Sequence, residues 1–114
     1  MTASGKTPDM PAPPEIDRIV HEPARYTIMA YLYVVESADF IYLLHHTQLT
    51  KGNLSSHLMK LEEAGYVRAE KTFVDRIPRT LLSLTPDGRA ALETYRDSIQ
   101  RMLKGPGKPR GKRR

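Results

Sequence analysis

The stretch LTKGNLSSHLMKLEEAG, residues 49–65 of the 114-residue chain, decides the fold. Thr50 has the side-chain oxygen that favours the N-cap position, and Gly65 has the conformational freedom that suits the end of a helix. Between them, leucines recur at the spacing that places side chains on one face of a helix. These leucines are Leu54, Leu58 and Leu61. The stretch therefore predicts an amphipathic helix over residues 50–64.

The face of this helix that points away from the leucines carries mostly small or polar side chains. Long side chains would hold another surface away, so this composition favours close approach. The free backbone N–H groups of the first turn favour phosphate. The residues of this face are Gly52, Asn53, Ser56, Met59, Lys60 and Glu63, with Lys51 and Ser55 on one flank. Basic residues also outnumber acidic residues between Lys51 and Arg79, so this region is the candidate binding site for a polyanion.

Two further helices are predicted upstream. Pro23 suits the first turn of a helix, and apolar residues recur at helical spacing over residues 24–35. Residues 16–20 either form a helical turn before that helix or pair with a second subunit. The segment Phe40–Thr47 places its apolar side chains on one side of a short helix, and a tight turn at Leu49 connects it to the helix over residues 50–64. The order is that of a helix-turn-helix.

Beyond Gly65 the pattern changes towards the period of a strand. Residues 66–74 are rich in Tyr, Val, Thr and Phe, residues 75–78 interrupt the pattern, and residues 80–84 resume it. This pattern predicts a β-hairpin with a charged tip. The sequence Thr85-Pro86-Asp87 then predicts the start of a final helix that runs to about Lys104, with a long apolar stripe.

The charge of the chain is concentrated in its tail. The sequence holds 18 Lys and Arg against 13 Asp and Glu, a net charge of +5, and six of the basic residues lie within residues 104–114. Residues 1–14 are rich in proline and poor in apolar groups, and we expect them to be disordered, like the basic tail 105–114. A single domain over residues 15–104 is predicted.

Several functional classes are excluded or disfavoured by composition. With no Cys, the chain cannot form disulfides, Cys-based metal sites or thiolate nucleophiles. It has no apolar run long enough to span a membrane, and its start lacks the apolar core of a secretory signal, so we expect a cytoplasmic protein without membrane contact. No Gly-rich phosphate loop and no nucleophile with a base at a recognisable spacing are present. We therefore expect neither an enzyme nor a cofactor.

The histidines do not predict a metal site. His45 and His46 are adjacent, so on a helix they point about 100° apart and do not readily share a metal. His57 lies on the flank near the leucines, where a partly buried structural role is the more common one. Metal binding is therefore not expected.

Taken together, the predicted elements and motifs resemble those of the small MarR/ArsR-like winged-helix regulators. The resemblance covers about residues 20–103. The strings that carry it are HEPAR (21–25), DF (39–40), LTKGNLSSHL (49–58), LEEAGYV (61–67), KTF (71–73), RIPRT (76–80) and LTPDGR (84–89). It implies a mainly α fold with a small β-hairpin (α+β), a winged helix-turn-helix with a long C-terminal dimerisation helix. It also implies a sequence-specific transcriptional regulator that binds double-stranded DNA as a homodimer.

In such a regulator the helix over residues 50–64 enters the major groove, and the wing over residues 66–84 touches the adjacent minor groove or the backbone. The residues expected to bind DNA are Lys51, Asn53, Ser55, Ser56, Lys60, Arg76 and Arg79. Six of them have a second interpretation. Asn53 either reads a base or bonds within the first helical turn, and Ser55 and Ser56 either contact phosphate or are merely small surface residues. Lys51 and Lys60 either meet phosphate or are solvated, and Arg79 either meets phosphate or forms a structural ion pair.

A second copy would bury the long stripe of the final helix more fully than a domain of this size can. The residues expected at the dimer interface are Tyr26, Tyr33, Leu92, Tyr95, Ile99, Met102 and Leu103. Tyrosines could instead line an effector pocket between the helices of the dimer, but a dimer core is the favoured explanation of the same residues. The candidates are Tyr26, Tyr31, Tyr33, Tyr42 and Tyr95. No motif identifies an effector.

Two alternative functions remain open. Winged helices also serve as protein-interaction modules, and residues 1–103 hold 12 basic against 13 acidic residues, a balance that suits such a role. The basic tail, by contrast, would favour sequence-independent association with DNA.

Overall fold

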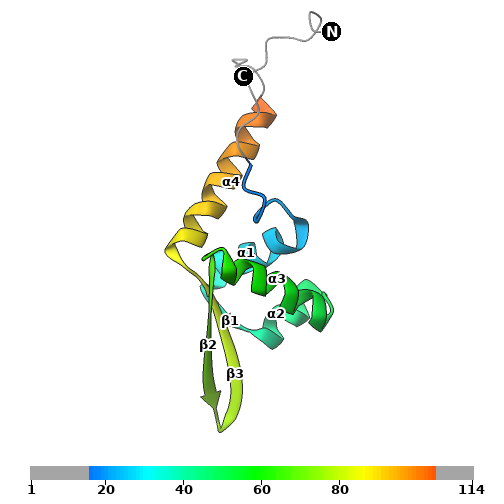
Figure 1. Ribbon diagram of the computed structural model, residues 1–114, viewed down its shortest axis with the longest axis vertical. Coiled ribbons are helices and arrows are strands. Elements are labelled where there is room, and N and C mark those ends of the chain that lie inside the picture. The colour runs from blue at the N-terminus through cyan, green and yellow to red at the C-terminus, as the bar shows by residue number, and fades with distance from the viewer. Residues whose placement is uncertain (1–15, 105–114) are drawn as a thin grey trace, which may run out of the picture.

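Four helices and a three-stranded antiparallel sheet make up residues 16–104, the part of the chain that the computed structural model describes (Figure 1). The elements in chain order are α1 (Pro23–Val35), β1 (Ser37–Asp39), α2 (Phe40–Thr47), α3 (Lys51–Glu63), β2 (Val67–Val74), β3 (Ile77–Leu84) and α4 (Pro86–Lys104). The hairpin of β2 and β3 and the helix α4 extend in opposite directions from the body (Figure 1). This arrangement confirms the predicted α+β winged helix-turn-helix. The predicted proline-rich segment 1–14 and basic tail 105–114 lie outside the described residues.

The core lies where α1, α2 and α3 meet the base of the sheet. Its members are the inward-facing apolar residues of each element, and burying one such side chain contributes about 1.5–3 kcal/mol. The fully buried ones are Val20, Ile28, Met29, Leu32, Leu43, Leu54, Leu61 and Leu82. Val20 precedes α1, and residues 18–20 form a turn that packs it into the core of its own chain. The sequence left two arrangements open for residues 16–20, a turn before α1 or pairing with a second subunit, and the structure has the turn.

Side-chain caps define where the helices begin. Thr50 Oγ1 accepts the backbone N–H of Asn53 at 3.1 Å, and Thr85 Oγ1 accepts that of Gly88 at 3.0 Å, as the sequence predicts. Two further caps carry carboxylates: Glu22 accepts from Arg25 N at 2.7 Å, and Asp39 accepts from Tyr42 N at 2.7 Å. Each cap satisfies a donor that would otherwise have no partner at the start of a helix.

The sheet contains one strand more than the predicted hairpin. Strand β1 pairs with β3, with Ala38 opposite Leu82, so the strand order is β1-β3-β2. No strand was predicted for residues 37–39. Three residues are too few to show a period of two, and the strand forms because Ala38, only 6% exposed, packs in the core beside β3.

The turn of the hairpin is also tighter than predicted. It consists of Asp75 and Arg76 alone, because Val74 pairs with Ile77 and the strand β3 already includes Pro78. Both turn residues have positive φ, 52° and 67°, as a two-residue type I′ turn requires. The predicted first strand ends at the same residue, Val74, but the second was predicted to start at Thr80. Strand β1 pairs only with residues 81–83, so at Pro78 β3 has no neighbour on that side, and a proline is tolerated there.

Helix α4 is joined to the end of α3 through backbone contacts. Gly65, with φ of 80°, ends the α3 turn, and Thr85 donates its hydroxyl to the Gly65 carbonyl at 2.6 Å. The Thr85 N–H donates to the Tyr66 carbonyl at 3.0 Å. A Cβ on Gly88 would lie 2.0 Å from that same carbonyl oxygen. Only a glycine therefore lets the first turn of α4 pack so closely on the chain that enters the wing.

Candidate nucleic-acid interface

Helix α3 buries its leucines and exposes its polar side. Leu54 and Leu61 are fully buried and Leu58 is 6% exposed, so the helix is anchored along one face. The predicted DNA-binding residues on this helix are all exposed. They are Lys51, Asn53, Ser55, Ser56 and Lys60. The structure therefore gathers these five residues on an accessible helix surface that carries no acid in its first turn.

The start of α3 leaves the side chain of Asn53 free of the capping role. The hydrogen bond in the first turn joins the Asn53 backbone N–H to Thr50 Oγ1, so Thr50 does the capping. An amide side chain in the first turn of a helix that enters the major groove has the donor and acceptor geometry to pair with adenine. The contact of Asn53 with a base stays a prediction.

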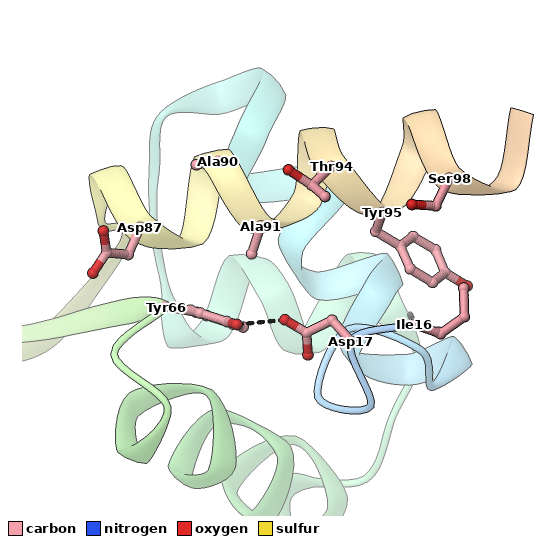
Figure 2. A pocket seen from close by; sticks show the side chains of 9 residues that line it. All are labelled: Ile16, Asp17, Tyr66, Asp87, Ala90, Ala91, Thr94, Tyr95 and Ser98. Atoms are coloured by element: carbon pink, nitrogen blue, oxygen red, sulfur yellow. Dashed lines mark hydrogen bonds between the residues drawn. The ribbon is translucent and has the colours of Figure 1, made fainter. Parts of the chain in front are cut away.

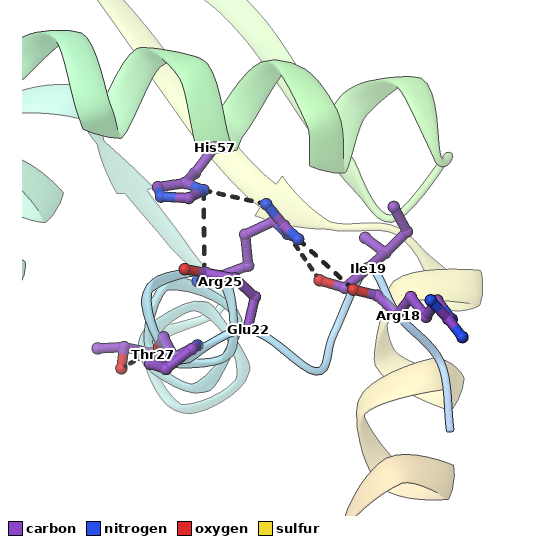
Figure 3. A network of polar contacts seen from close by, with 7 residues as sticks. Arg18, Ile19, Glu22, Arg25, Thr27 and His57 are labelled. Carbon is purple, nitrogen blue, oxygen red and sulfur yellow. Dashed lines mark hydrogen bonds and ion pairs between the residues drawn. The ribbon is translucent and has the colours of Figure 1, made fainter. Parts of the chain in front are cut away.

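A polar network on the side of α3 that faces α1 connects the helix to the chain before α1 (Figure 3). The Arg25 guanidinium on α1 donates to the Ile19 carbonyl at 2.7 Å and contacts His57 Nδ1 at 3.2 Å. His57 Nδ1 also lies 3.9 Å from a carboxylate oxygen of Glu22, the α1 cap. An arginine can join three segments in this way because its guanidinium presents several donors in a fixed plane.

This network explains the half-buried His57 as a structural residue, as the sequence predicts. The contribution of Arg25 was missed, because its partner His57 lies 32 residues further along the chain. The only signal was the string HEPAR itself, which holds both Glu22 and Arg25. The network fixes the orientation of α3 relative to α1, and with it the direction of the exposed polar face.

The two predicted wing arginines have different surroundings. Arg76 occupies the exposed tip of the hairpin. Arg79 lies further up β3, where a guanidinium nitrogen is 3.4 Å from a carboxylate oxygen of Asp39, the α2 cap. The pair thus links the wing to the helix-turn-helix, which is the structural ion pair considered for Arg79. Its side chain is still 36% exposed, and its contact with DNA stays a prediction.

The predicted dimer residues of α1 and α4 differ in exposure. Leu92 is only 7% exposed and belongs to the core of the single chain, so it has little surface left for a partner. Tyr33 donates to Glu93 at 2.6 Å and lies under the Arg89 guanidinium, 4.5 Å from the ring centre. By contrast, the end of the stripe is open: Met102 is 48% exposed and Leu103 is 82% exposed.

An exposed valine on α1 extends the same surface. Val34 is 78% exposed and, with Tyr26, lines a groove of about 150 Å³ between α1 and α4. The ring of Tyr26 lies 5.6 Å from that of Tyr95, centre to centre. Val34 was not among the predicted interface residues, because it lies off the apolar stripe of α1. The sequence did hold one signal that Val34 belongs to this surface, namely its position about two helical turns after Tyr26.

The tyrosines do not converge on one pocket in the single chain. Tyr26, Tyr33 and Tyr95 lie on the α1 and α4 surface. Tyr31 and Tyr42 instead pack against His46, with ring centres 5.9 and 4.2 Å away. The five residues proposed as a single effector lining therefore belong to two separate places.

A larger cavity of about 360 Å³ lies between α4, the segment before α1 and the start of β2 (Figure 2). Tyr66 donates a hydrogen bond to Asp17 at its edge, while Ala90 and Ala91 form part of the α4 wall (Figure 2). This hydrogen bond, together with burial and the negative charge of Asp17, raises the pKa of Tyr66 to about 12. Because Asp17 already accepts the N–H groups of Ile19 and Val20, its carboxylate serves the local fold.

Within residues 16–104, no three His, Asp or Glu side chains lie close enough together to hold a metal ion. No helix in the same range is both long and apolar enough to cross a bilayer.

Residues 24–103 match the family of winged helix DNA-binding domains. The chain is also 37% identical over 87 residues to an uncharacterized protein of Methanocaldococcus jannaschii, which covers 76% of this chain and 95% of the relative. The chain therefore belongs to the winged helix DNA-binding domain family. The resemblance predicted from the sequence is confirmed at this level.

Solved structures agree with this assignment. A transcriptional regulator homologue from Pyrococcus horikoshii OT3 is 32% identical with a TM-score of 0.73, covering 77% of this chain and 87% of that chain. The transcriptional regulator BldR from Sulfolobus solfataricus is 22% identical with a TM-score of 0.62, covering 73% of this chain and 58% of that chain, and shows the fold alone. Family and fold point to a DNA-binding regulator.

Proposed function

We propose that the chain is a sequence-specific transcriptional regulator that binds a pseudo-palindromic operator as a homodimer. The observation that carries this proposal is the exposed polar face of α3, anchored by buried leucines and oriented by the Arg25 network. In this proposal α3 enters the major groove. Asn53 reads a base, Lys51 and Lys60 meet phosphates, and the wing lies over the adjacent minor groove or backbone.

Dimerisation would place two α3 helices on successive turns of one duplex. The support for a dimer is the apolar surface of α1 and α4, where Val34, Met102 and Leu103 are 78%, 48% and 82% exposed. Large exposed apolar side chains on two neighbouring helices commonly mark a protein–protein interaction site. A twofold dimer would bring this surface against its own copy and present a twofold operator with matching half-sites.

Selection of bound duplexes from a random DNA pool tests the operator. An enriched inverted repeat with half-sites about one helical turn apart is expected. Asn53→Ala should relax the preference at one position per half-site, at a cost of about 1–3 kcal/mol. Thr94→Ala is the matched control, because Thr94 is exposed on α4, away from the polar face of α3. Unchanged preference in the Asn53→Ala protein would remove Asn53 as a base-reading residue, and unchanged binding by both Asn53→Ala and Lys51→Ala would remove this face of α3 as the DNA contact. Absence of any enriched sequence would favour the nonspecific or protein-binding alternatives.

Sedimentation equilibrium tests the dimer. Val34→Glu together with Leu103→Glu should shift the chain to monomer, because each carboxylate would be desolvated against its counterpart. Ile41→Glu is a matched control, since Ile41 is 54% exposed on α2 and outside the proposed surface. A dimer that resists the double change while weakening with Ile41→Glu would place the interface elsewhere.

A further inference from the structure

One large apolar side chain lies among the polar ones on the exposed face of α3. Met59 is 58% exposed. Ser55 and Ser56, four and three positions before it, are its neighbours on this face because helix residues at that spacing lie side by side. Leu58, only 6% exposed, holds the opposite side of the same turn in the core, so the helix cannot rotate to bury the methionine. Met59 therefore belongs to the surface that the proposed function places in the major groove.

All of the oxidisable sulfur in this chain is the thioether sulfur of methionine. The sequence holds five methionines and no cysteine. Of the three methionines within residues 16–104, Met29 is fully buried in the core, and Met102 is 48% exposed on α4. An oxidant must reach a sulfur to oxidise it, so exposure determines which of the three reacts first. Met59 is the most exposed of them, and it alone lies on α3.

The chemistry of the major groove determines what a thioether can contact there. The base edges present hydrogen-bond donors and acceptors, and their one apolar group is the methyl group of thymine. A methionine side chain is unbranched and polarisable, so it adapts its shape to such a group. Met59 lies six residues after Asn53, a rise of about 9 Å along the helix axis. For a helix that lies along the groove, this rise corresponds to roughly two to three base pairs.

We propose that Met59 packs against a thymine methyl group of the operator, and that oxidation of its sulfur by hydrogen peroxide releases the DNA. The proposal rests on the proposed function and deepens it, because it names a regulated contact within the DNA-binding face. In the oxidation, a lone pair on Sδ attacks one oxygen of the peroxide and the O–O bond breaks. The hydroxide that leaves takes the proton from the oxygen that stays on sulfur, so the products are methionine sulfoxide and water. The sulfur loses two electrons and the peroxide gains them.

The added oxygen makes the contact unfavourable. Methionine sulfoxide is polar, whereas the thioether is apolar. Packing the sulfoxide oxygen against a methyl group would remove its water without supplying a hydrogen-bond donor. We therefore expect operator affinity to fall about tenfold on oxidation. The change is reversible, because methionine sulfoxide reductases restore the thioether.

Peroxide treatment of the full chain tests the switch. Peptide mass spectrometry locates the sulfoxide at Met59, and operator affinity is measured before treatment, after treatment and after incubation with methionine sulfoxide reductases. Wild-type affinity should fall about tenfold and then recover. Met59→Leu keeps an apolar side chain of similar volume and leaves the other four methionines in place. Its affinity should lie within about threefold of the wild type and should not respond to peroxide.

Met102→Leu is the matched control. It removes the other exposed thioether of residues 16–104, which lies on α4 and outside the polar face of α3. The Met102→Leu protein should lose operator affinity with peroxide to the same extent as the wild type. A thermal melt of each oxidised protein at one fixed concentration verifies that the fold persists.

Deoxyuridine in the operator tests the contact with thymine, since this nucleoside differs from thymidine only in lacking the C5-methyl group. Thymidines are replaced one at a time. Wild-type binding should weaken at one position in each half-site, roughly two to three base pairs from the position at which Asn53→Ala relaxes the preference. In the Met59→Gln protein the replacement at that position should have no effect, because the amide has no apolar contact with the methyl group to lose.

Three results would overturn the inference while leaving the proposed function intact. Complete oxidation of Met59 with unchanged affinity would show that its sulfur does not meet the operator. An equal loss of affinity in the Met59→Leu protein would place the sensitivity at another residue. A deoxyuridine effect that persists in the Met59→Gln protein would assign the thymine contact elsewhere. In each case the selected operator and the effect of Asn53→Ala would stand, whereas a wild-type protein that selects no operator would overturn the proposed function and the inference together.

Discussion

Replacing Gly88 by alanine tests the closest backbone packing in the molecule. In an open helix the change would be favourable, since alanine is preferred over glycine by about 1 kcal/mol. At Gly88 the new Cβ would meet the Tyr66 carbonyl oxygen at 2.0 Å, its carbonyl carbon at 2.8 Å and its Cα at 2.9 Å. All three are backbone atoms, so no side-chain rotation relieves the overlap.

The structure allows the size of the effect to be worked out. Moving the Tyr66 carbonyl away would break the hydrogen bond that it accepts from Thr85 N at 3.0 Å. Overpacking costs about 1–3 kcal/mol, and here the larger part of that range applies because backbone meets backbone. After subtraction of the gain in helix propensity, we expect a net loss of about 2 kcal/mol. For a domain of this size that lowers the Tm by roughly 8–16 °C.

The measurement is a thermal melt followed by circular dichroism, at one fixed protein concentration because a dimer would make the Tm concentration-dependent. Gly52→Ala is the matched control: it lies in the first turn of α3 with no atom within 4 Å of the added Cβ. We expect Gly52→Ala to leave the Tm unchanged or raise it by a few degrees. A Gly88→Ala protein that melts with or above the wild type would refute the close contact between α4 and the chain at Tyr66.

Three further changes test other parts of the structure. Stability should fall as the pH rises from about 10 to about 12. The pKa of Tyr66 is raised to about 12 in the folded chain, so the protonated form that stabilises the fold is lost over that range. In urea melts, Tyr66→Phe should lose less stability over this pH range than the wild type. Leu61→Ala should cost about 2–5 kcal/mol, since the side chain is fully buried, and a smaller change in urea midpoint would place Leu61 outside the core. Arg25→Lys should weaken both stability and operator affinity, because an ammonium cannot donate in the planar fork that joins the Ile19 carbonyl to His57; equal binding by both proteins would show that the network does not orient α3.

The sequence determined the features that depend on near neighbours along the chain. The leucine spacing and the caps at Thr50 and Thr85 predicted α3 and α4, because helix formation depends on side chains three or four residues apart. Alternating residues predicted the hairpin in the same way. The exposed polar residues of α3, including Asn53, could be chosen from the sequence since the leucines already determined which face is buried.

The tertiary structure decided the features that join distant segments. Strand β1 forms only where Ala38 meets Leu82, and the contact of Arg25 with His57 spans 32 residues. The glycine at position 88 shows its importance only where α4 crosses the Tyr66 carbonyl. None of these contacts leaves a periodic trace in the sequence, because each depends on the path by which the chain returns. Local patterns therefore predict the elements, whereas packing between elements determines the orientation of α3 and of the wing.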